Sequence, residues 1–405
     1  KGNRLSGGNY GSYSTIMNEE GEYVDVPEPN YEAGIKLQGS GETGPEDTEI
    51  GEISGYLTPF SYNKYGIHVD GVKGRTFIRG TGIYGSTLCG VLVANMSESV
   101  SIGDSSLWGN YKGLCVEDSE NVSTGSNHID GNMIDGTSIV RSHKISLEGD
   151  LVQTNKGDGI HIEESSAIAM SGLKVQYNEK NGIVIEKPPS VSKGAMTIGE
   201  SPSGTQALKK RITRIDAMNP LPFDDNDAMK NYIYGNKENG VYIHSGARDV
   251  GIKFSEIAGN DAGGVRIEAA GENISVESSI IGKTVEWAPM SDNFGGVIIL
   301  DSEGAVRIGG ANRGNLISGN ASHGVFIKDS GNVTIEGNYI GSDMSGLDAN
   351  ANFGDGIHIE GSHAIDIGVG GLDSANLISG NKLAGIYMDM EGMLSGNRVE
   401  GNFIK

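Results

Sequence analysis

A four-residue unit recurs thirteen times along the chain: glycine, an apolar residue, a variable residue and a second apolar residue. Its glycines are Gly34, Gly66, Gly90, Gly113, Gly136, Gly159, Gly182, Gly240, Gly264, Gly296, Gly324, Gly356 and Gly385. Of the 26 residues one and three places after these glycines, only Thr137 is polar. Alternation with a period of two is typical of a β-strand that buries one face. We therefore predict thirteen short strands whose apolar faces share a core.

Successive repeats lie 23 to 32 residues apart, except for one interval of 58 residues that follows Gly182. No segment between them shows the apolar period of a helix. Short strands at such regular spacing are typical of a chain that coils once per repeat and stacks its strands in parallel sheets. Ile, Val and Leu would fill the interior of each coil.

A second regularity concerns the turn before each strand. Asparagine stands four residues before the repeat glycine in eight of the thirteen repeats. These residues are Asn132, Asn155, Asn178, Asn236, Asn260, Asn320, Asn352 and Asn381. Asparagine tolerates left-handed backbone and bonds turn amides through its side chain. We therefore expect the stacked turns to form an asparagine ladder.

Three segments resemble the repeats of right-handed parallel β-helix proteins. They are GNYIGSDMSGLDANANFGDGIHIEG from Gly337 to Gly361, VRIGG from Val306, and NLISGN, which occurs at Asn315 and again at Asn376. The resemblance implies an all-β, right-handed parallel β-helix, a single-stranded solenoid of about 13–14 coils. Such repeats belong to large bacterial cell-surface and secreted proteins, and to pectate lyases and related enzymes of the pectate-lyase-like superfamily. They are specific for fold and poorly specific for activity.

The repeats extend over nearly the whole chain. We expect residues 1–405 to form one continuous β-helix, a fragment of a longer chain. The opening resembles the middle of a repeat, and the last residues stop where another repeat would continue. Residues 188–233 are expected to form an irregular insertion that includes a hidden coil with a strand near Met196. This insertion carries the only concentrated positive charge, a candidate site for an anionic sugar or a partner: Lys209, Lys210, Arg211 and Arg214.

The two cysteines, Cys89 and Cys115, are expected to remain unpaired. Strict alternation counted from the repeat glycines places them on opposite faces of neighbouring strands. A disulfide needs converging side chains and Cα atoms within about 7 Å. The sequence therefore predicts no disulfide.

The amino-acid composition limits the classes of partner that the protein is expected to bind. The formal net charge is −22, which disfavours nucleic acid because binding there depends on Lys and Arg that neutralise phosphates. An acidic polysaccharide would also be repelled unless divalent cations bridge it to the protein. No apolar run approaches the roughly 20 residues of a membrane span, so no membrane insertion is expected. An acidic surface suits a soluble extracellular or cell-surface location.

Candidate chemistry lies at the outward positions two and four residues after the glycines. His161 and His358 each precede a glutamate by two residues, Glu163 and Glu360 respectively. Glu163 and Glu186 fall on neighbouring coils at strand spacing, so they are the candidate ligands for Ca²⁺. The alternative is that these carboxylates only keep the surface soluble.

A further set of outward residues is a candidate for ligand binding. Tyr242, Phe326 and Tyr387 could stack on sugar rings, although single exposed apolar residues are also normal. Arg266, with Glu268 beside it, is the nearest match to the basic residue that the resemblance to pectate lyases implies. No residue is assigned a catalytic role.

These observations favour a structural or adhesive segment of a large extracellular protein that binds glycans. The alternative is a polysaccharide lyase or epimerase that acts on an acidic polysaccharide with calcium. The Asp-Pro-His-Glu run of alginate epimerases and lyases is absent, which weakens the enzyme hypothesis. Self-assembly, with Phe326 and Tyr387 buried against another chain, is a third hypothesis.

Overall fold

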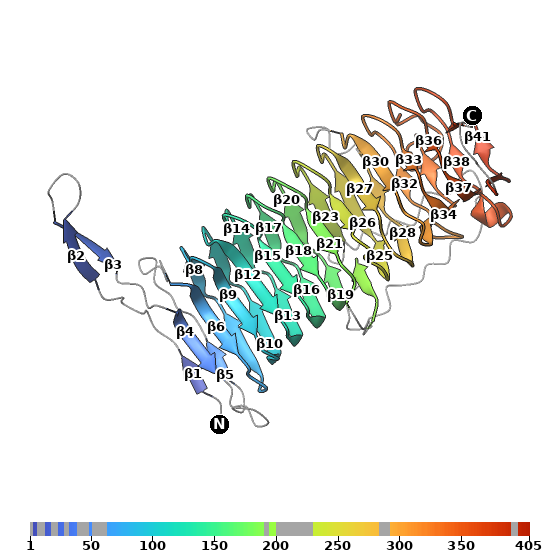
Figure 1. The fold of residues 1–405 in the computed structure, drawn as a ribbon. Helices are drawn as coiled ribbons and strands as arrows, with labels where there is room; N and C mark the ends of the chain where they lie inside the picture. Colours follow the sequence, from blue (N-terminus) through green and yellow to red (C-terminus); the bar gives the residue numbers. More distant parts are fainter. Residues whose placement is uncertain are drawn as a thin grey trace. The chain divides into compact units, whose positions relative to one another are not determined.

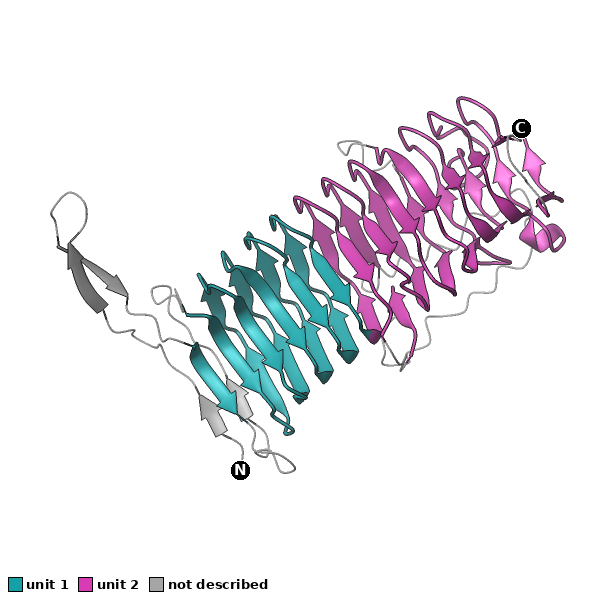
Figure 2. Ribbon diagram, viewed as in Figure 1, with its two compact units in different colours: residues 1–165 teal, residues 166–405 magenta. Residues whose placement is uncertain are grey.

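The computed structural model describes residues 32–38, 63–189, 194–199, 230–282, 292–389 and 396–405, and the backbone of short strands at 3–5, 13–17, 23–27 and 48–50. It divides into two compact units, residues 1–165 and 166–405 (Figure 2). Within each unit the strands of successive coils pair side by side (Figure 1). The described residues contain no helix that is long and apolar enough to cross a membrane.

Unit 1 carries strands of three parallel sheets and one antiparallel hairpin, β2 (Tyr13–Met17) with β3 (Tyr23–Pro27). The first sheet contains β1 (Asn3–Leu5), β5 (Thr48–Ile50), β7 (Thr76–Arg79), β10 (Glu98–Gly103), β13 (Glu120–Gly125) and β16 (His143–Glu148). The second sheet contains β8 (Gly82–Tyr84), β11 (Ser106–Trp108), β14 (His128–Asp130) and β17 (Leu151–Gln153). The third sheet contains β4 (Ala33–Gln38), β6 (Tyr65–Asp70), β9 (Cys89–Ala94), β12 (Lys112–Glu117), β15 (Thr137–Val140) and β18 (Ile160–Glu163).

Unit 2 also carries strands of the three parallel sheets. Its first sheet contains β19 (Ser166–Ser171), β22 (Met196–Ile198), β25 (Val250–Lys253), β28 (Ile274–Glu277), β31 (Val306–Gly309), β34 (Gly331–Glu336), β37 (His363–Ile367) and β40 (Arg398–Val399). Its second contains β20 (Lys174–Gln176), β23 (Asn231–Tyr234), β26 (Ser255–Ala258), β29 (Ile280–Ile281), β32 (Leu316–Ile317), β35 (Tyr339–Ile340), β38 (Leu377–Ile378) and β41 (Phe403–Ile404). Its third contains β21 (Ile183–Glu186), β24 (Val241–His244), β27 (Gly263–Glu268), β30 (Gly295–Leu300), β33 (Val325–Lys328), β36 (Ile357–Glu360) and β39 (Ile386–Met388).

The repeat strands that the sequence predicts are the strands of the third sheet. Their pairing is parallel and in register, so that Ile243, Ile267 and Ile299 occupy equivalent places on consecutive strands. All three are fully buried, as expected for aliphatic side chains that stack at the strand spacing of about 4.8 Å. The fold is therefore the right-handed parallel β-helix that the sequence predicts, with the handedness that parallel crossover connections almost always have.

The described strands of the long interval between Gly182 and Gly240 belong to one coil. β21 pairs directly with β24, with Ile183 opposite Val241. A strand does form around Met196, but it is β22, which lies in the first sheet between β19 and β25. Among the described strands, the one near Met196 thus belongs to the same coil as β21. Residues 190–193 and 200–229 of the expected insertion lie outside the described residues.

The predicted asparagine ladder is present at the turn before the third sheet. In unit 1 the Asn132 N–H donates to Oδ1 of Asn155 at 3.0 Å. In unit 2 the Asn320 N–H donates in the same way to Asn352 at 3.2 Å. A Cβ at the repeat glycine Gly356 would lie 2.8 Å from the ladder amide of Asn381 and 2.6 Å from a backbone oxygen. The glycine is therefore required because the ladder and the next coil leave no room for a side chain.

The prediction about the cysteines is wrong. Cys89 and Cys115 form a disulfide, with their Cα atoms 6.1 Å apart. A Cβ at Gly90 would point inward, 2.9 Å from the ladder amide of Asn110, and Val91 is fully buried as well. Two consecutive inward positions reverse the alternation at the repeat glycine. The residue before that glycine and the residue two places after it consequently share the outer face.

Reduction of this disulfide should destabilise the protein. In the chain-entropy model a bridge that closes a loop of this length contributes about 3–4 kcal/mol, across a sequence separation of 26 residues. Thermal unfolding with and without reductant measures the loss, and a Cys89→Ser, Cys115→Ser double variant should unfold at the lower temperature under both conditions. Two reactive thiols in the denatured, unreduced protein would contradict the disulfide.

Asp150 provides a pH-dependent test of the packing. It lies in a second ladder of unit 1, at the turn before the second sheet, where Asn127 in turn accepts the N–H of Ser105. Oδ1 of Asp150 accepts the backbone N–H of Asn127 at 2.8 Å, and Oδ2 accepts the hydroxyl of Thr124. Burial raises the pKa of Asp150 to about 6. Because the unfolded chain has a lower value, near 3.9, the native state holds the proton more tightly. Stability should thus fall as pH rises from about 4 to 6 and remain lower above that window.

Asp150→Asn should therefore stabilise the protein at pH 7.5 by about 2–3 kcal/mol and give little change at pH 4. Asparagine keeps the Oδ1 acceptor and carries no charge that burial would penalise. Denaturant unfolding at both pH values measures the difference, and Asp104→Asn, at an exposed aspartate, is the matched control. A stabilisation of equal size at both pH values would contradict the raised pKa.

Candidate functional site

The outer face of the third sheet in unit 2 presents two columns of side chains. The inner column, two residues after each repeat glycine, consists of Val184, Tyr242, Arg266, Ile298, Phe326, His358 and Tyr387. The outer column, two residues further on, consists of Glu186, His244, Glu268, Leu300, Lys328 and Glu360. Most of the candidate residues named from the sequence lie in these columns.

Four of the candidates form one charged network, completed by a histidine. The Tyr242 hydroxyl donates to Oε2 of Glu268 at 2.6 Å, and Nε of Arg266 donates to the same oxygen at 2.9 Å. His244 stacks on Tyr242 with ring centroids 4.3 Å apart, and its Nε2 lies 3.7 Å from Oε2 of Glu186. The network thus neutralises the positive charge of Arg266 within the protein.

The electrostatics of this network argue against a role for Tyr242 as a general base that removes a proton from a substrate. Burial, and then the hydrogen bond to Glu268, raise the pKa of Tyr242 to about 12. The hydrogen bond from Tyr242 is the main cause that lowers the pKa of Glu268. A tyrosine that holds its proton this firmly is a poor general base near neutral pH.

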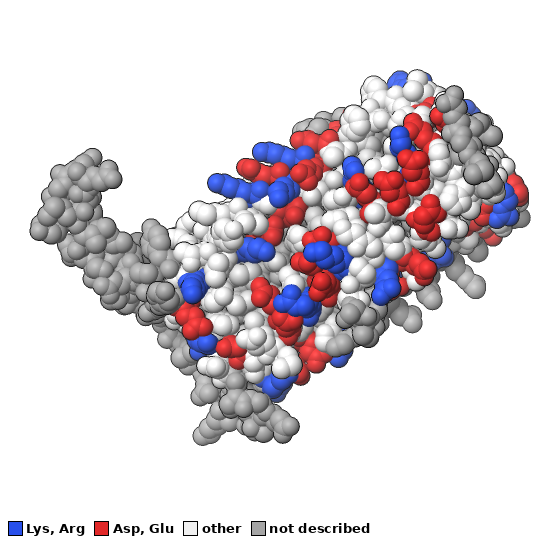
Figure 3. Space-filling model, in the orientation of Figure 1, with Lys and Arg blue, Asp and Glu red and all other residues white. Residues whose placement is uncertain are grey.

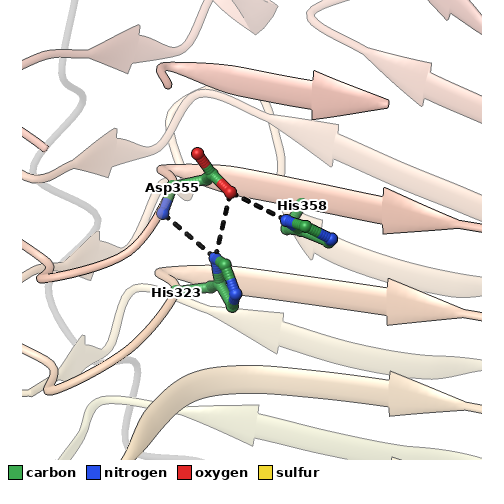
Figure 4. A group of neighbouring side chains, drawn as sticks. All are labelled: His323, Asp355 and His358. Atoms are coloured by element: carbon green, nitrogen blue, oxygen red, sulfur yellow. Dashed lines mark hydrogen bonds and ion pairs between the residues drawn. The ribbon is translucent and has the colours of Figure 1, made fainter. Parts of the chain in front are cut away.

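His358 belongs to a second group, which we call the histidine–aspartate cluster: His323, Asp355 and His358 (Figure 4). His323 and Asp355 each stand directly before a repeat glycine, at the starts of β33 and β36. Oδ2 of Asp355 lies 2.7 Å from Nδ1 of His358 and 3.3 Å from Nδ1 of His323. The two imidazole rings therefore converge on one carboxylate oxygen.

Hydrogen bonds hold each member of the histidine–aspartate cluster in place. Oδ1 of Asp355 accepts the N–H of Ala384 at 2.7 Å, and Nδ1 of His323 accepts the Asp355 N–H at 3.0 Å. Nε2 of His358 lies 3.2 Å from Oε1 of Glu360. Burial is the main cause that lowers the pKa of His323, and electrostatic repulsion from His358 adds to it. A hydrogen bond from Lys328 is the main cause that lowers the pKa of Glu360.

Phe326 and Tyr387 cover the ring of His358 from the neighbouring strands. The centroid of Phe326 lies 5.4 Å and that of Tyr387 4.6 Å from the centroid of His358. Because the rings lie against one another, little of the face of Phe326 or His358 is left for a sugar. Tyr387, 45% exposed, retains the most accessible ring of the three.

Unit 1 contains a counterpart of the histidine–aspartate cluster. The heptapeptide GDGIHIE occurs at Gly157–Glu163 and again at Gly354–Glu360. In unit 1 Asp158 and His161 are joined by Asp135, whose Oδ1 accepts the Asp158 N–H at 3.1 Å. Nζ of Lys112 lies 3.3 Å from the other oxygen of Asp135, so a lysine supplies positive charge here.

Sequence reasoning considered the histidines and missed the residues directly before the repeat glycines. Asp355 and His323 were overlooked because strict alternation places that position in the core. The repeated heptapeptide was the available signal. It occurs twice, and each copy places an aspartate three residues before a histidine.

Two predictions remain untested. Glu163 ends β18 of unit 1 and Glu186 ends β21 of unit 2, and their shared calcium ion stays a prediction. The basic run Lys209, Lys210, Arg211 and Arg214 lies outside the described residues.

An aromatic pair on the second sheet of unit 1, an exposed tryptophan against a half-buried tyrosine, was not predicted from the sequence. Tyr84 and Trp108, which we call the ring platform, stack in register with centroids 4.5 Å apart and planes at 16°. Trp108 is 49% exposed. A Cβ at Gly82, on the same outer face, would meet nothing within 4 Å. The platform is therefore open to solvent on that side.

Polar side chains continue the face beside the ring platform. Asp130 on β14 is the register partner of Trp108, and Gln153 on β17 follows it. Nε2 of His128 lies 3.1 Å from Nε2 of Gln153 and 3.6 Å from Oδ2 of Asp130. An aromatic surface bordered by amide, carboxylate and imidazole groups combines apolar contact with hydrogen bonding, as ligand sites generally do.

Charge on the surface is mixed. On the face drawn in Figure 3, acidic and basic side chains lie among one another and do not form separate stripes. Individual pairs show the reason: Lys328 lies 3.0 Å from Glu360, and Arg141 lies 2.7 Å from Asp118. Glu360 of the outer column and Asp118 of unit 1 are thus partly neutralised by basic neighbours on adjacent coils.

Comparison with known proteins gives one family. Residues 14–192, less than half of the chain, are similar to the NosD family, which is described as periplasmic copper-binding protein. No curated protein matches the sequence.

Several solved structures are similar in fold. The A-module of the Azotobacter vinelandii mannuronan C-5 epimerase AlgE4 is 16% identical, with coverage of 91% of this chain and 84% of that chain and a TM-score of 0.37. The periplasmic alginate epimerase AlgG is 11% identical over 92% and 78%, with a TM-score of 0.43. Tailspike protein 2 of Escherichia coli O157:H7 bacteriophage CAB120 is 10% identical over 76% and 34%, with a TM-score of 0.40. Identities this low leave the function to be argued from the residues.

The charged network gives a testable pKa. The absorbance difference between the wild type and Tyr242→Phe isolates the titration of one tyrosine, whose pKa is raised to about 12. Glu268→Gln should lower this midpoint toward the ordinary value of about 10, because the tyrosinate would no longer face a carboxylate. Circular dichroism at each pH confirms that the protein remains folded, and an unchanged midpoint in Glu268→Gln would contradict the assignment.

Proposed function

We propose that this chain is a glycan-binding, adhesive segment of an extracytoplasmic β-helix protein, and that the ring platform of unit 1 holds the glycan. The observation that carries the proposal is the half-exposed Trp108 stacked on Tyr84, with hydrogen-bonding side chains on the adjoining strands. Aromatic rings offer large apolar contact area at low entropic cost, and their polar neighbours bind the hydroxyl groups.

Location outside the cytoplasm is supported by the Cys89–Cys115 disulfide. Structural disulfides form and persist in oxidising compartments and are rare in the cytosol. The proposal also includes attachment to a cell surface, for which the support is the resemblance to the repeats of surface proteins.

We propose a neutral glycan as the ligand. The chain carries a formal charge of −22, and Asp130 adds a carboxylate directly beside Trp108. A polyanion such as pectate or alginate would approach this surface against electrostatic repulsion. A neutral chain meets no such barrier and can accept hydrogen bonds from Gln153 and donate them to Asp130.

Replacement of the indole should weaken binding while the fold is preserved. Trp108 is one of two tryptophans in the sequence, so Trp287→Phe leaves it as the only one, and its emission should change when a neutral oligosaccharide such as a β-glucan or mannan fragment binds. Trp108→Ala should lower the affinity about tenfold, or ~1.4 kcal/mol, as measured by calorimetry.

The control is Tyr387→Ala, which removes an exposed ring from unit 2 and should leave the affinity unchanged. Loss of binding in Tyr387→Ala but not in Trp108→Ala would overturn the placement on unit 1. Pectate and alginate, tested with and without calcium, should give neither tight binding nor the absorbance of unsaturated products. Unsaturated products would instead support a polysaccharide lyase.

A further inference from the structure

The geometry of the histidine–aspartate cluster points to a site for a divalent first-row transition ion such as Zn²⁺ or Cu²⁺, bound by Nδ1 of His323, Nδ1 of His358 and Oδ2 of Asp355. These residues lie outside the stretch similar to the NosD family. The inference is independent of glycan binding at the ring platform.

The distances suit a small tetrahedral ion. Bonds of about 2.1 Å to nitrogen and oxygen place tetrahedral ligands roughly 3.4 Å apart. Nδ1 of His323 already lies 3.3 Å from Oδ2 of Asp355, whereas Nδ1 of His358 lies closer, at 2.7 Å. All three ligand atoms lie within 4.8 Å of one another. An ion therefore requires Nδ1 of His358 to move away from Asp355 by less than about 1 Å, as ~3.4 Å is the tetrahedral separation. Three protein ligands leave the fourth position open.

Three potential ligand atoms converge in the cluster. Nδ1 of His323 carries a lone pair, because it accepts the N–H of Asp355 at 3.0 Å. Nδ1 of His358 donates to Oδ2 of Asp355 at 2.7 Å in the absence of an ion. An ion would take the place of that proton, and the neutral ring would then donate from Nε2 to Glu360, 3.2 Å away. At His323 the ion would replace the hydrogen bond from the Asp355 N–H by a coordinate bond.

The surroundings of His358 are those of a metal ligand. A ligating histidine usually donates its other N–H to a carboxylate, which fixes the ring and its tautomer. Glu360 occupies this place and is itself held by Lys328 at 3.0 Å. Phe326 and Tyr387 lie against the imidazole, so water is partly excluded from the site.

The counterpart in unit 1 explains why the proposal is confined to unit 2. There Lys112 lies 3.3 Å from Asp135 and provides the cation within the protein. Among the described residues, no lysine or arginine forms an ion pair with Asp355, whose ion-pair partners are His323 and His358. Two imidazole nitrogens and one carboxylate oxygen favour zinc or copper over calcium, which prefers oxygen ligands alone.

The test uses the full chain, stripped of metal with a chelator and dialysed against Zn²⁺, Cu²⁺ or Ca²⁺ separately. We expect the wild type to retain one equivalent of Zn²⁺ or Cu²⁺. In His323→Gln and in His358→Gln the affinity for the ion should fall on the order of 100-fold, so that dialysis removes it. Glu360→Gln should weaken binding about tenfold. Substitution by Co²⁺ should give visible absorption in the wild type that both histidine variants lack.

His161→Gln is the matched control, because it alters the same heptapeptide in unit 1 and should retain the bound equivalent. Circular dichroism and thermal unfolding of each variant separate loss of the site from loss of the fold. The proposal is overturned if the wild type binds no transition ion, if His161→Gln loses it equally, or if calcium binds there in its place.

Discussion

The in-register stacking of coils is the constraint on which every other feature depends. A parallel strand that slipped by one residue would turn its aliphatic side chains to solvent and its polar ones to the core. Two sets of contacts hold the register within each unit: columns of buried Ile, Val and Leu, and ladders in which one backbone N–H donates to the asparagine of the next coil. Both sets fail together if the register shifts.

The outer faces carry no such constraint, because side chains that point outward do not fill the core. Chemistry can therefore vary from coil to coil on an unchanged interior. Unit 1 uses this freedom for the half-exposed ring platform on its second sheet, and unit 2 for the charged network and the histidine–aspartate cluster on its third. Asp355 contributes both to the stacking of the coils and to the chemistry of the outer face. Its Oδ1 accepts a hydrogen bond from Ala384 of the next coil, and its Oδ2 faces the histidines.

The repeated heptapeptide shows how the preceding coil decides the chemistry of a site. In both units an aspartate and a histidine stand in the same order on the same kind of strand. In unit 1 the coils before it supply Asp135 and Lys112, which form an ion pair. In unit 2 the coil before it supplies His323, a neutral ligand with a lone pair directed at Asp355. Identical local sequence thus gives a closed ion-pair group in one unit and a candidate metal site in the other.

The sequence alone determined the strands of the third sheet, their parallel stacking and most of the asparagine ladder, because a period of two and a recurring glycine are properties of the chain. It also named Tyr242, Arg266 and Glu268, which the structure joins by hydrogen bonds. Only the tertiary structure decided what happens at the repeat glycine, where two consecutive inward positions bring Cys89 to Cys115 and His323 to Asp355. At that glycine the next coil and the ladder amide approach the backbone closely, and these contacts between coils are not expressed by the alternation within one strand.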